Sequence, residues 1–303
     1  MKIRITFVVV ISFLTTLFSI QDTFSQDYIF KVLLEDGQAL VKSNESWQEL
    51  QRGTALGMGD ILQLKEGAYL GLIHSGGHTL AIDKPGIYAV HDLATQFVNP
   101  SAGIALKYAE LLLDEMDSHK VNLAYGPERS DGKEAKLQLL LPTSVAVYSK
   151  EVIVRWNEVE SVDVYEVVLK NMFDEVIKSE EVSDTQYMLD FTDNTVAQEK
   201  LVIITVKAKG EQSIQSGNYG IKPLSKEEAI FIKKELDNLK REISEKESAL
   251  DKLLLASFYE QNNLLIDALT NYEYAIRHSP NVEAFKTAYN QFLLRNGLSR
   301  TIN

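Results

Sequence analysis

The spacing of hydrophobic residues divides the chain into β-like and helical stretches. Residues 28–92 are short apolar runs separated by turn signals at residues 35–37, 75–77 and 84–86. Closely spaced turns of this kind predict an all-β unit. From residue 101 to about residue 119, apolar residues recur at helical spacing, which predicts one helix packed beside that unit.

A second β pattern and a helical end follow along the chain. The polar, glycine-containing segment at residues 125–140 is interpreted as a linker. Residues 141–223 hold about seven short runs rich in β-branched and aromatic residues, which predicts a β-sandwich with Trp156 and Tyr165 in its core. After Pro223 the pattern is helical to residue 303.

The helical end opens with a capping box formed by Ser225 and Glu228. An apolar seam in three- and four-residue steps, broken at Lys246, then runs along residues 226–253. Its members are Ala229, Ile232, Leu236, Leu239, Ile243, Leu250 and Leu253. This spacing is typical of a coiled coil. It predicts packing on the chain's own C-terminal helices or, as the alternative, self-association through a helix 226–253.

Glycines are concentrated in residues 47–82, where they either hold a phosphate or turn corners between strands. A phosphate-binding loop leads directly into a helix, whose N-terminus holds the anion. Here Gly59 and Asp60 lead instead into residues 61–64, which alternate like a strand. These glycines are therefore predicted to form turns.

The spacing of six residues in this stretch resembles the FecR-type domain of bacterial envelope proteins. They are Trp47, Leu50, Gly53, Leu56, Gly59 and Asp60. The resemblance covers residues 30–92. It implies a β-rich, non-catalytic extracytoplasmic domain, which we place at residues 27–98 with a helix at residues 99–124 packed on it.

The rest of the chain resembles two further domain types. Residues 141–223 resemble a fibronectin type III or immunoglobulin-like domain, which implies a spacer or adhesive role. Residues 224–303 resemble a tetratricopeptide repeat (TPR), a helical pair that binds protein segments in a groove. The matching positions are Leu255, Ala256, Tyr259, Ala268, Tyr272, Ala275 and Pro280. Only about one and a half repeats are present, so a capping or self-association role is the alternative.

Residues 1–26 have the layout of a secretory signal peptide, with Lys2 and Arg4 before an apolar run at residues 7–20. Retention of this segment as an anchor is the alternative. No later segment is apolar enough to span a membrane, so we expect no integral membrane segment after signal removal. The chain has no cysteine, which excludes disulfides, and its net charge of −12 argues against nucleic acid as a partner.

Candidate chemistry is sparse in this sequence. His74 and His78 flank a hairpin turn and could share a metal ion, but exposed hairpin histidines are more often solvated. No Gly-x-Ser-x-Gly elbow is present. We therefore expect no metal, no cofactor and no enzymatic activity.

These patterns predict a multidomain protein, β then α, built from a FecR-like β domain, a β-sandwich and a TPR-like helical region. The expected function is that of a non-catalytic exported scaffold or adaptor for protein–protein interactions in the bacterial cell envelope. The expected location is the periplasm, with the cell surface or secretion as alternatives, and the expected partners are other envelope proteins. The alternative function is binding of cell-wall or surface polysaccharide by the β domains, with Trp47, Tyr69, Tyr88 and Phe97 as an aromatic platform.

Overall fold

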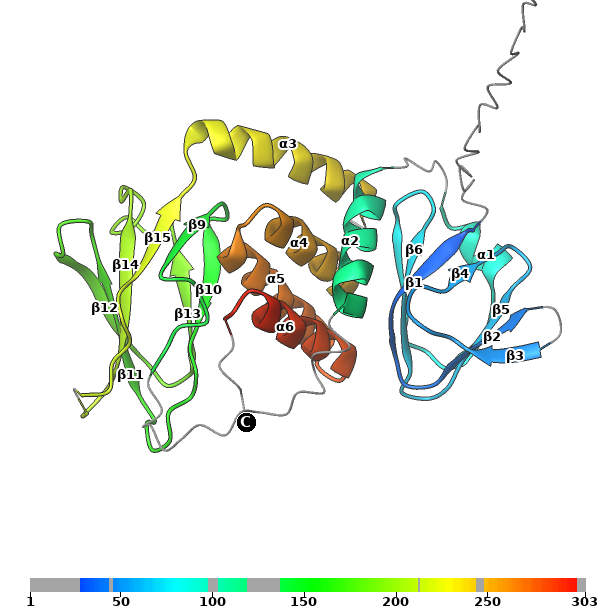
Figure 1. Cartoon of the computed structure of the whole chain (residues 1–303), viewed down its shortest axis with the longest axis horizontal. Helices are drawn as coiled ribbons and strands as arrows, with labels where there is room; N and C mark the ends of the chain where they lie inside the picture. Colours follow the sequence, from blue (N-terminus) through cyan, green and yellow to red (C-terminus); the bar gives the residue numbers. More distant parts are fainter. Residues whose placement is uncertain are drawn as a thin grey trace, which may run out of the picture.

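The structure is a computed structural model that describes residues 28–298, with gaps at 44–45, 98–102, 119–136, 212 and 244–247. The predicted signal peptide at residues 1–26 and most of the predicted linker at 125–140 lie outside the described residues. β-sheets come first along the chain and most of the helices come last, as the sequence predicted. In space, a layer of helices lies between two β units (Figure 1).

The N-terminal β unit consists of two four-stranded antiparallel sheets, with strand orders β4-β1-β6-β7 and β3-β2-β5-β8. The elements are β1 (Phe30–Asp36), β2 (Ala39–Ser43), β3 (Ser46–Glu49), β4 (Ala55–Leu56), β5 (Ile61–Leu64), β6 (Tyr69–His74), β7 (Thr79–Ile82), β8 (Gly86–Ala89) and the short helix α1 (Val90–Ala94). Phe30, Leu56 and Leu62 are fully buried between the sheets. The predicted glycine turn between β6 and β7 is confirmed, because Gly77 has a φ of 91°.

Strand β6 is buried on both of its faces. Leu70 and Leu72 belong to the core of the N-terminal β unit, whereas Tyr69 and Ile73 pack into the helical layer. Gly71 lies in the same outward row as Tyr69 and Ile73, where a Cβ would stand 3.0 Å from Cδ1 of Leu250. Glycine at this strand position therefore lets the sheet approach the helices closely.

The second β unit is a sandwich of a five-stranded sheet, β12-β11-β14-β15-β9, and a two-stranded sheet, β10-β13. The strands are β9 (Ser144–Val147), β10 (Glu151–Arg155), β11 (Tyr165–Lys170), β12 (Val176–Val182), β13 (Gln186–Asp190), β14 (Val202–Ala208) and β15 (Tyr219–Pro223). Trp156 and Tyr165 are both buried in its core, as predicted, with ring centroids 5.5 Å apart in an edge-to-face arrangement.

The helices of the middle layer are α2 (Ile104–Ser118), α3 (Lys226–Glu242), α4 (Ala249–Gln261), α5 (Leu265–His278) and α6 (Glu283–Arg295). The predicted capping box of Ser225 and Glu228 begins α3. The expected continuous helix 226–253 is wrong, because α3 ends at Glu242 and Ile243 has extended backbone. A second capping box, made by Ser248 and Asp251, then begins α4.

The apolar seam of this region packs inside the molecule. Six of its seven residues are buried, namely Ile232, Leu236, Leu239, Ile243, Leu250 and Leu253. Packing on the chain's own helices, one of the two sequence interpretations, is therefore what the structure has. Self-association through a single helix 226–253 is not supported. The described residues form two helices there, and six of the seven seam residues are buried inside the molecule.

A single hydrophobic core joins the three parts of the molecule. It runs from Leu33 and Ile73 of the N-terminal β unit, through the helices, to Ile153 and Val154 of the sandwich. Helix α2, predicted to pack on the N-terminal β unit, also packs on α3 and α4. No helix in the described part of the chain is long and apolar enough to cross a membrane.

Candidate interaction surfaces

The six residues of the FecR-like motif have different places in the N-terminal β unit. Leu50 and Leu56 are buried in its core. Gly53 has a φ of 81° and lies in the turn that precedes β4. Asp60 closes the turn that contains Gly59, since its carboxylate accepts the backbone N–H of Gly57 at 2.7 Å. These residues therefore shape the fold.

Trp47 is the exception, because it lies on the molecular surface. Its side chain is 43 % exposed on β3, the edge strand of the second sheet. The register places Trp47 in one row with Lys42, Ile61 and Ala89. The next outward row contains Leu40, Gln63 and Ile87, and Ile87 is 67 % exposed. We call this apolar surface, made by Leu40, Trp47, Ile61, Ile87 and Ala89, the outer β face.

The TPR-like positions lie in α4, in α5 and in the turn after α5. Six of the seven are buried, namely Leu255, Ala256, Tyr259, Ala268, Tyr272 and Ala275, while Pro280 is exposed before α6. The two helices pack against each other, and their other sides are covered by the same chain. Helix α4 contacts α2 and β7, whereas α5 contacts β9, β10 and α6. Where the resemblance implied a peptide-binding groove, the chain's own elements fill the space.

Helix α5 is bound to the sandwich by a row of polar side chains. The Asp267 carboxylate accepts the backbone N–H groups of Tyr148 at 3.0 Å and Ser149 at 2.7 Å. One turn further along α5, the Thr270 hydroxyl oxygen accepts the N–H of Ile153 at 2.8 Å. Burial raises the pKa of Asp267, and the N–H groups that it accepts partly oppose this effect.

The same row ends in an ion pair. Glu273, two turns along α5 from Asp267, accepts a hydrogen bond from Nη2 of Arg155 at 3.0 Å. The side chain of Glu273 is buried, and Arg155 closes the row at the end of β10. Asp267 thus satisfies backbone N–H groups of the β9–β10 turn, and Thr270 satisfies the N–H of Ile153 in β10, which points away from β13. Sequence reasoning missed this row, because polar residues on a helix normally indicate a solvated face.

Helix α4 is bound to the N-terminal β unit in a similar way. Asp251 is fully buried and accepts the hydroxyl of Thr79 on β7. Its other oxygen accepts the backbone N–H and the hydroxyl of Ser248, each at 2.8 Å. One carboxylate thus caps α4 and holds β7. The Ser248-x-x-Asp251 spacing was a usable sequence signal for this cap.

A buried ionic cluster joins α2, α4 and α6. Arg295 donates from Nε and Nη2 to the two carboxylate oxygens of Glu260, at 2.7 and 2.6 Å. Nη2 also lies 3.2 Å from Glu115 of α2 and donates to the Tyr272 hydroxyl at 3.0 Å. The pKa of Glu115 is raised to about 7, first by burial and then by the nearby Glu260 charge, while Arg295 opposes the rise.

The two histidines of the first β unit pack on one aromatic ring. His74 and His78 both stack on Phe97, with centroid distances of 5.2 and 5.5 Å. Nδ1 of His74 accepts the N–H of Gly76 at 2.9 Å, and burial lowers the pKa of this histidine. Among the residues that the structure describes, no three acidic, histidine or cysteine side chains are grouped so that they could hold a metal ion.

The aromatic platform considered for polysaccharide binding does not form. Tyr69 is buried against Phe285, with ring centroids 5.5 Å apart. Phe97 is in contact with the histidines and with Phe30. Of the four proposed rings, Trp47 alone remains on the surface as a large exposed side chain.

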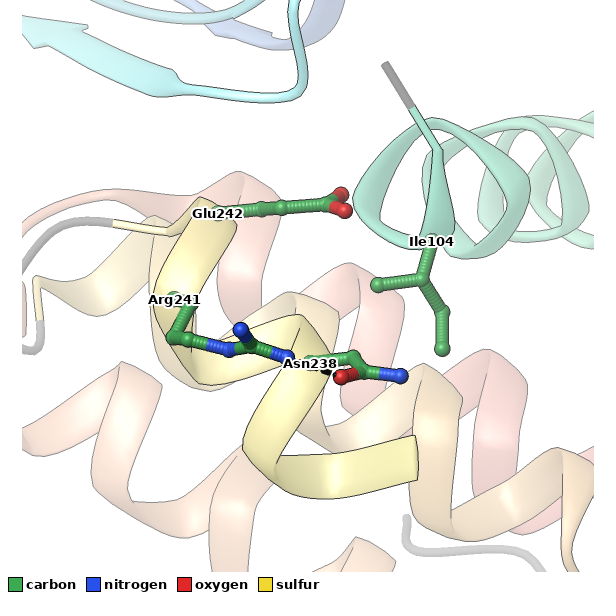
Figure 2. A pocket seen from close by; sticks show the side chains of 4 residues that line it. All are labelled: Ile104, Asn238, Arg241 and Glu242. Atoms are coloured by element: carbon green, nitrogen blue, oxygen red, sulfur yellow. Dashed lines mark hydrogen bonds between the residues drawn. The ribbon is translucent and has the colours of Figure 1, made fainter. Parts of the chain in front are cut away.

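A hollow of about 360 Å³ lies where α3 meets the start of α2. Its lining residues are Ile104, Asn238, Arg241 and Glu242, and Figure 2 shows the Glu242 carboxylate directed at the first turn of α2. Glu242 accepts the N–H of Ala105 at 2.8 Å and so caps that helix. Arg241 donates to Asn238. Glu242 therefore serves the contact between α2 and α3, whereas Arg241 and Asn238 are bonded to each other within α3.

Comparison with known proteins adds no identification. No protein-family model matches the chain. No curated protein matches it with significant similarity.

Proposed function

We propose that this protein is a non-catalytic scaffold of the bacterial cell envelope, exported to the periplasm, that holds two β units at a fixed separation for binding to other envelope proteins. The observation that carries the proposal is the hydrophobic cluster that joins outward residues of β1 and β6, the helical layer and the sandwich into one packed body. A rigid body of this kind keeps two surfaces at a constant distance, which is what a scaffold requires.

The helical layer supports this role as an internal joint. Asp267 and Thr270 of α5 bind backbone groups of the sandwich, while Asp251 of α4 binds Thr79 of the N-terminal β unit. Both attachments come from the same pair of helices. In this proposal the TPR-like pair therefore holds the protein together, and partners bind elsewhere.

Two exposed apolar surfaces lie far apart and are the proposed contact sites. One is the outer β face defined above. The other is the hairpin between β11 and β12, where Met172, Phe173 and Val176 are exposed. The strands that bear them lie at opposite ends of the molecule (Figure 1). Exposed apolar groups of this kind are typical of protein-binding surfaces.

In-cell crosslinking of the full-length protein tests the proposal. The variants are Ile87→Lys on the outer β face and Phe173→Lys on the hairpin, and the control is Ile230→Lys on α3, which is 69 % exposed. Full-length variants are needed, because stopping the chain after Pro223 would uncover the core surfaces that α4 and α5 bury. We expect specific protein crosslinks that the first two substitutions reduce and the control leaves intact. Equal crosslinks in the wild-type protein and its three variants, or no crosslinks above background, would overturn the proposal.

One observation favours a second candidate function, the binding of cell-wall or surface polysaccharide. Trp47 lies at the edge of a sheet face whose other residues include the polar side chains Lys42 and Gln63. An exposed ring beside hydrogen-bonding groups suits the stacking of a sugar. A pull-down with insoluble cell-wall material tests this function, and loss of binding in Trp47→Ala, with Met58→Ala unchanged, would support it.

A further inference from the structure

The edges of the sandwich sheets are protected unequally. Helix α5 packs against β9 and β10, and the backbone of β10 is bonded to Thr270. Strand β12 carries Lys178, Glu180 and Glu181 and pairs through a register shift, and both features discourage pairing with another chain. Strand β13 lies at the far edge of the two-stranded sheet, pairs without a register shift and carries one charged residue, Asp190, at its end.

The hydrogen-bond phase shows which backbone groups of β13 face outward. Phe191 donates to the carbonyl of Lys150, and Trp156 donates to the carbonyl of Thr185. In an antiparallel pair, hydrogen-bonded residue pairs alternate with non-bonded pairs along the strands, so these two bonds fix the pattern between them. Residues 187 and 189 therefore bond to β10, whereas the N–H groups of residues 186, 188 and 190 point away from it. Ile153, the partner of residue 188, confirms this phase because its N–H leaves the sheet to reach Thr270.

The outward groups are open along the middle of the strand. No described residue donates to or accepts from the backbone of Met188 outside the sheet, and its side chain is 40 % exposed. An unpaired edge with an exposed apolar side chain at its centre can take up an additional strand.

Charge indicates what kind of strand this edge would accept. Residues 183–194 contain three aspartates and no basic residue. Asp193 is paired with Lys178, but Asp190 lies directly across from Glu151, an arrangement of like charges that weakens a sheet. A lysine or arginine placed beside Asp190 would relieve that repulsion. At the other end of β13, Arg277 already contacts Gln186.

We propose that the free edge of β13 binds an extended, basic segment of another protein by strand addition, with an apolar residue beside Met188 and a basic residue beside Asp190. The proposal rests on the scaffold function and names a partner type for it. A second copy of this chain is a poor occupant, because β13 contains Asp190 and no basic residue, so pairing two β13 edges supplies no cation for either Asp190.

The test uses purified full-length protein and the ten-residue peptide Thr-Lys-Thr-Val-Thr-Lys-Thr-Val-Thr-Lys. Its lysines and valines share one face of an extended strand. There are two comparison peptides. One has glutamate in place of each lysine, and the other has N-methyl groups on alternate residues so that its backbone cannot pair. We expect saturable binding of the first peptide and about tenfold weaker binding, or none, of the other two.

Amide hydrogen exchange gives the signature of strand addition. The peptide should slow exchange at residues 186, 188 and 190 and leave residues 187 and 189 unchanged, because the latter already bond to β10. Met188→Lys should weaken binding about tenfold. Met58→Lys makes the same change at a methionine that is 51 % exposed in the N-terminal β unit, and it should have no effect.

Three results would overturn the proposal. They are absence of binding by the lysine peptide, binding that the N-methylated peptide matches, and protection that does not alternate along β13. Protection of the same amides by raising the protein concentration alone would show that the occupant is a second copy. Failure here leaves the scaffold proposal standing on its own crosslinking test, which does not use the β13 edge.

Discussion

The carboxylate of Asp267 accepts the backbone N–H of Ser149 at 2.7 Å across 118 residues of sequence. This bond joins the middle of the helical layer to the turn between β9 and β10. Asp267 is fully buried and serves a second N–H group, that of Tyr148. The attachment of α5 to the sandwich thus depends strongly on one side chain.

Replacing Asp267 should therefore lower the stability of the whole protein. Asp267→Ala leaves two buried N–H groups without an acceptor, at a cost of about 2–4 kcal/mol, and Asp267→Asn should cost less because one oxygen remains. Urea unfolding measures both values. Asp163→Ala is the control, because Asp163 is exposed and its loss should change stability by less than about 0.5 kcal/mol. Equal stability of the Asp267 and Asp163 variants would show that the attachment contributes nothing.

Gly71 and Leu250 should behave as a coupled pair. Gly71→Ala adds a Cβ 3.0 Å from Cδ1 of Leu250, and the resulting crowding should cost about 1–3 kcal/mol. In the Leu250→Val background the added cost should be smaller by at least about 0.5 kcal/mol, as a double-mutant cycle would detect. Gly59→Ala is the matched control, since no atom lies within 4 Å of its added Cβ. Strict additivity at Gly71 and Leu250 would contradict the close approach of sheet and helix.

The contribution of Glu115 to stability should fall as pH rises from about 4.5 to about 7. The pKa of Glu115 is raised from 4.5 to about 7, so in this window the folded protein binds a proton that the unfolded chain has released. The stabilisation is complete below pH 4.5 and is lost as pH rises through about 7. Its size is on the order of 1–3 kcal/mol.

Glu115→Gln isolates this effect, because it keeps the shape of the side chain and removes its titration. Asp267, whose pKa is also raised by burial, contributes in the same direction in both proteins. The difference in unfolding free energy between wild type and Glu115→Gln should therefore change across pH 4.5–7. A difference that is constant over that range would exclude Glu115 as a source of the pH dependence of stability.

The FecR-like motif should separate into structural and surface positions. Leu56→Ala removes a fully buried side chain and should cost about 2–5 kcal/mol. Trp47→Ala, at an exposed edge strand, should cost less than about 1 kcal/mol. Thermal unfolding of the two variants provides the measurement. A larger loss of stability for Trp47→Ala than for Leu56→Ala would contradict the assignment of Leu56 as structural and Trp47 as a surface position.

The parts of the fold that depend on local patterns could be predicted from sequence. Turns such as that at Gly77 depend on backbone freedom at one residue, and the cap at Ser225 depends on a residue three positions away. The core positions of Trp156 and Tyr165 followed from the strand pattern. The division into β units followed by helices could therefore be predicted.

The features that join these parts could not be predicted in the same way. The sequence of α5 indicates an exposed polar face at Asp267, Thr270 and Glu273. Their partners at residues 148–155 are about 120 positions away in the chain, so no local pattern reveals them. The break after Glu242 had two local signals, the interruption of the apolar seam at Lys246 and the capping spacing of Ser248 and Asp251, but neither specifies where the helix ends. The edge at β13 follows from strand order, which periodicity does not specify.

The common core also has a consequence for how the protein is made. Ile73 and Ile153 are covered by a helical layer whose last helix ends at Arg295, so both β units keep apolar surface uncovered until the final fifth of the chain has emerged. Domains that are synthesised first commonly fold first. Here the β units cannot bury all of their apolar surface when they are first made. A nascent or prematurely ended chain must therefore be shielded from aggregation. The C-terminal helices thus act as the last step of maturation, and a chain that lacks them is recognisable as incomplete by its exposed hydrophobic surface.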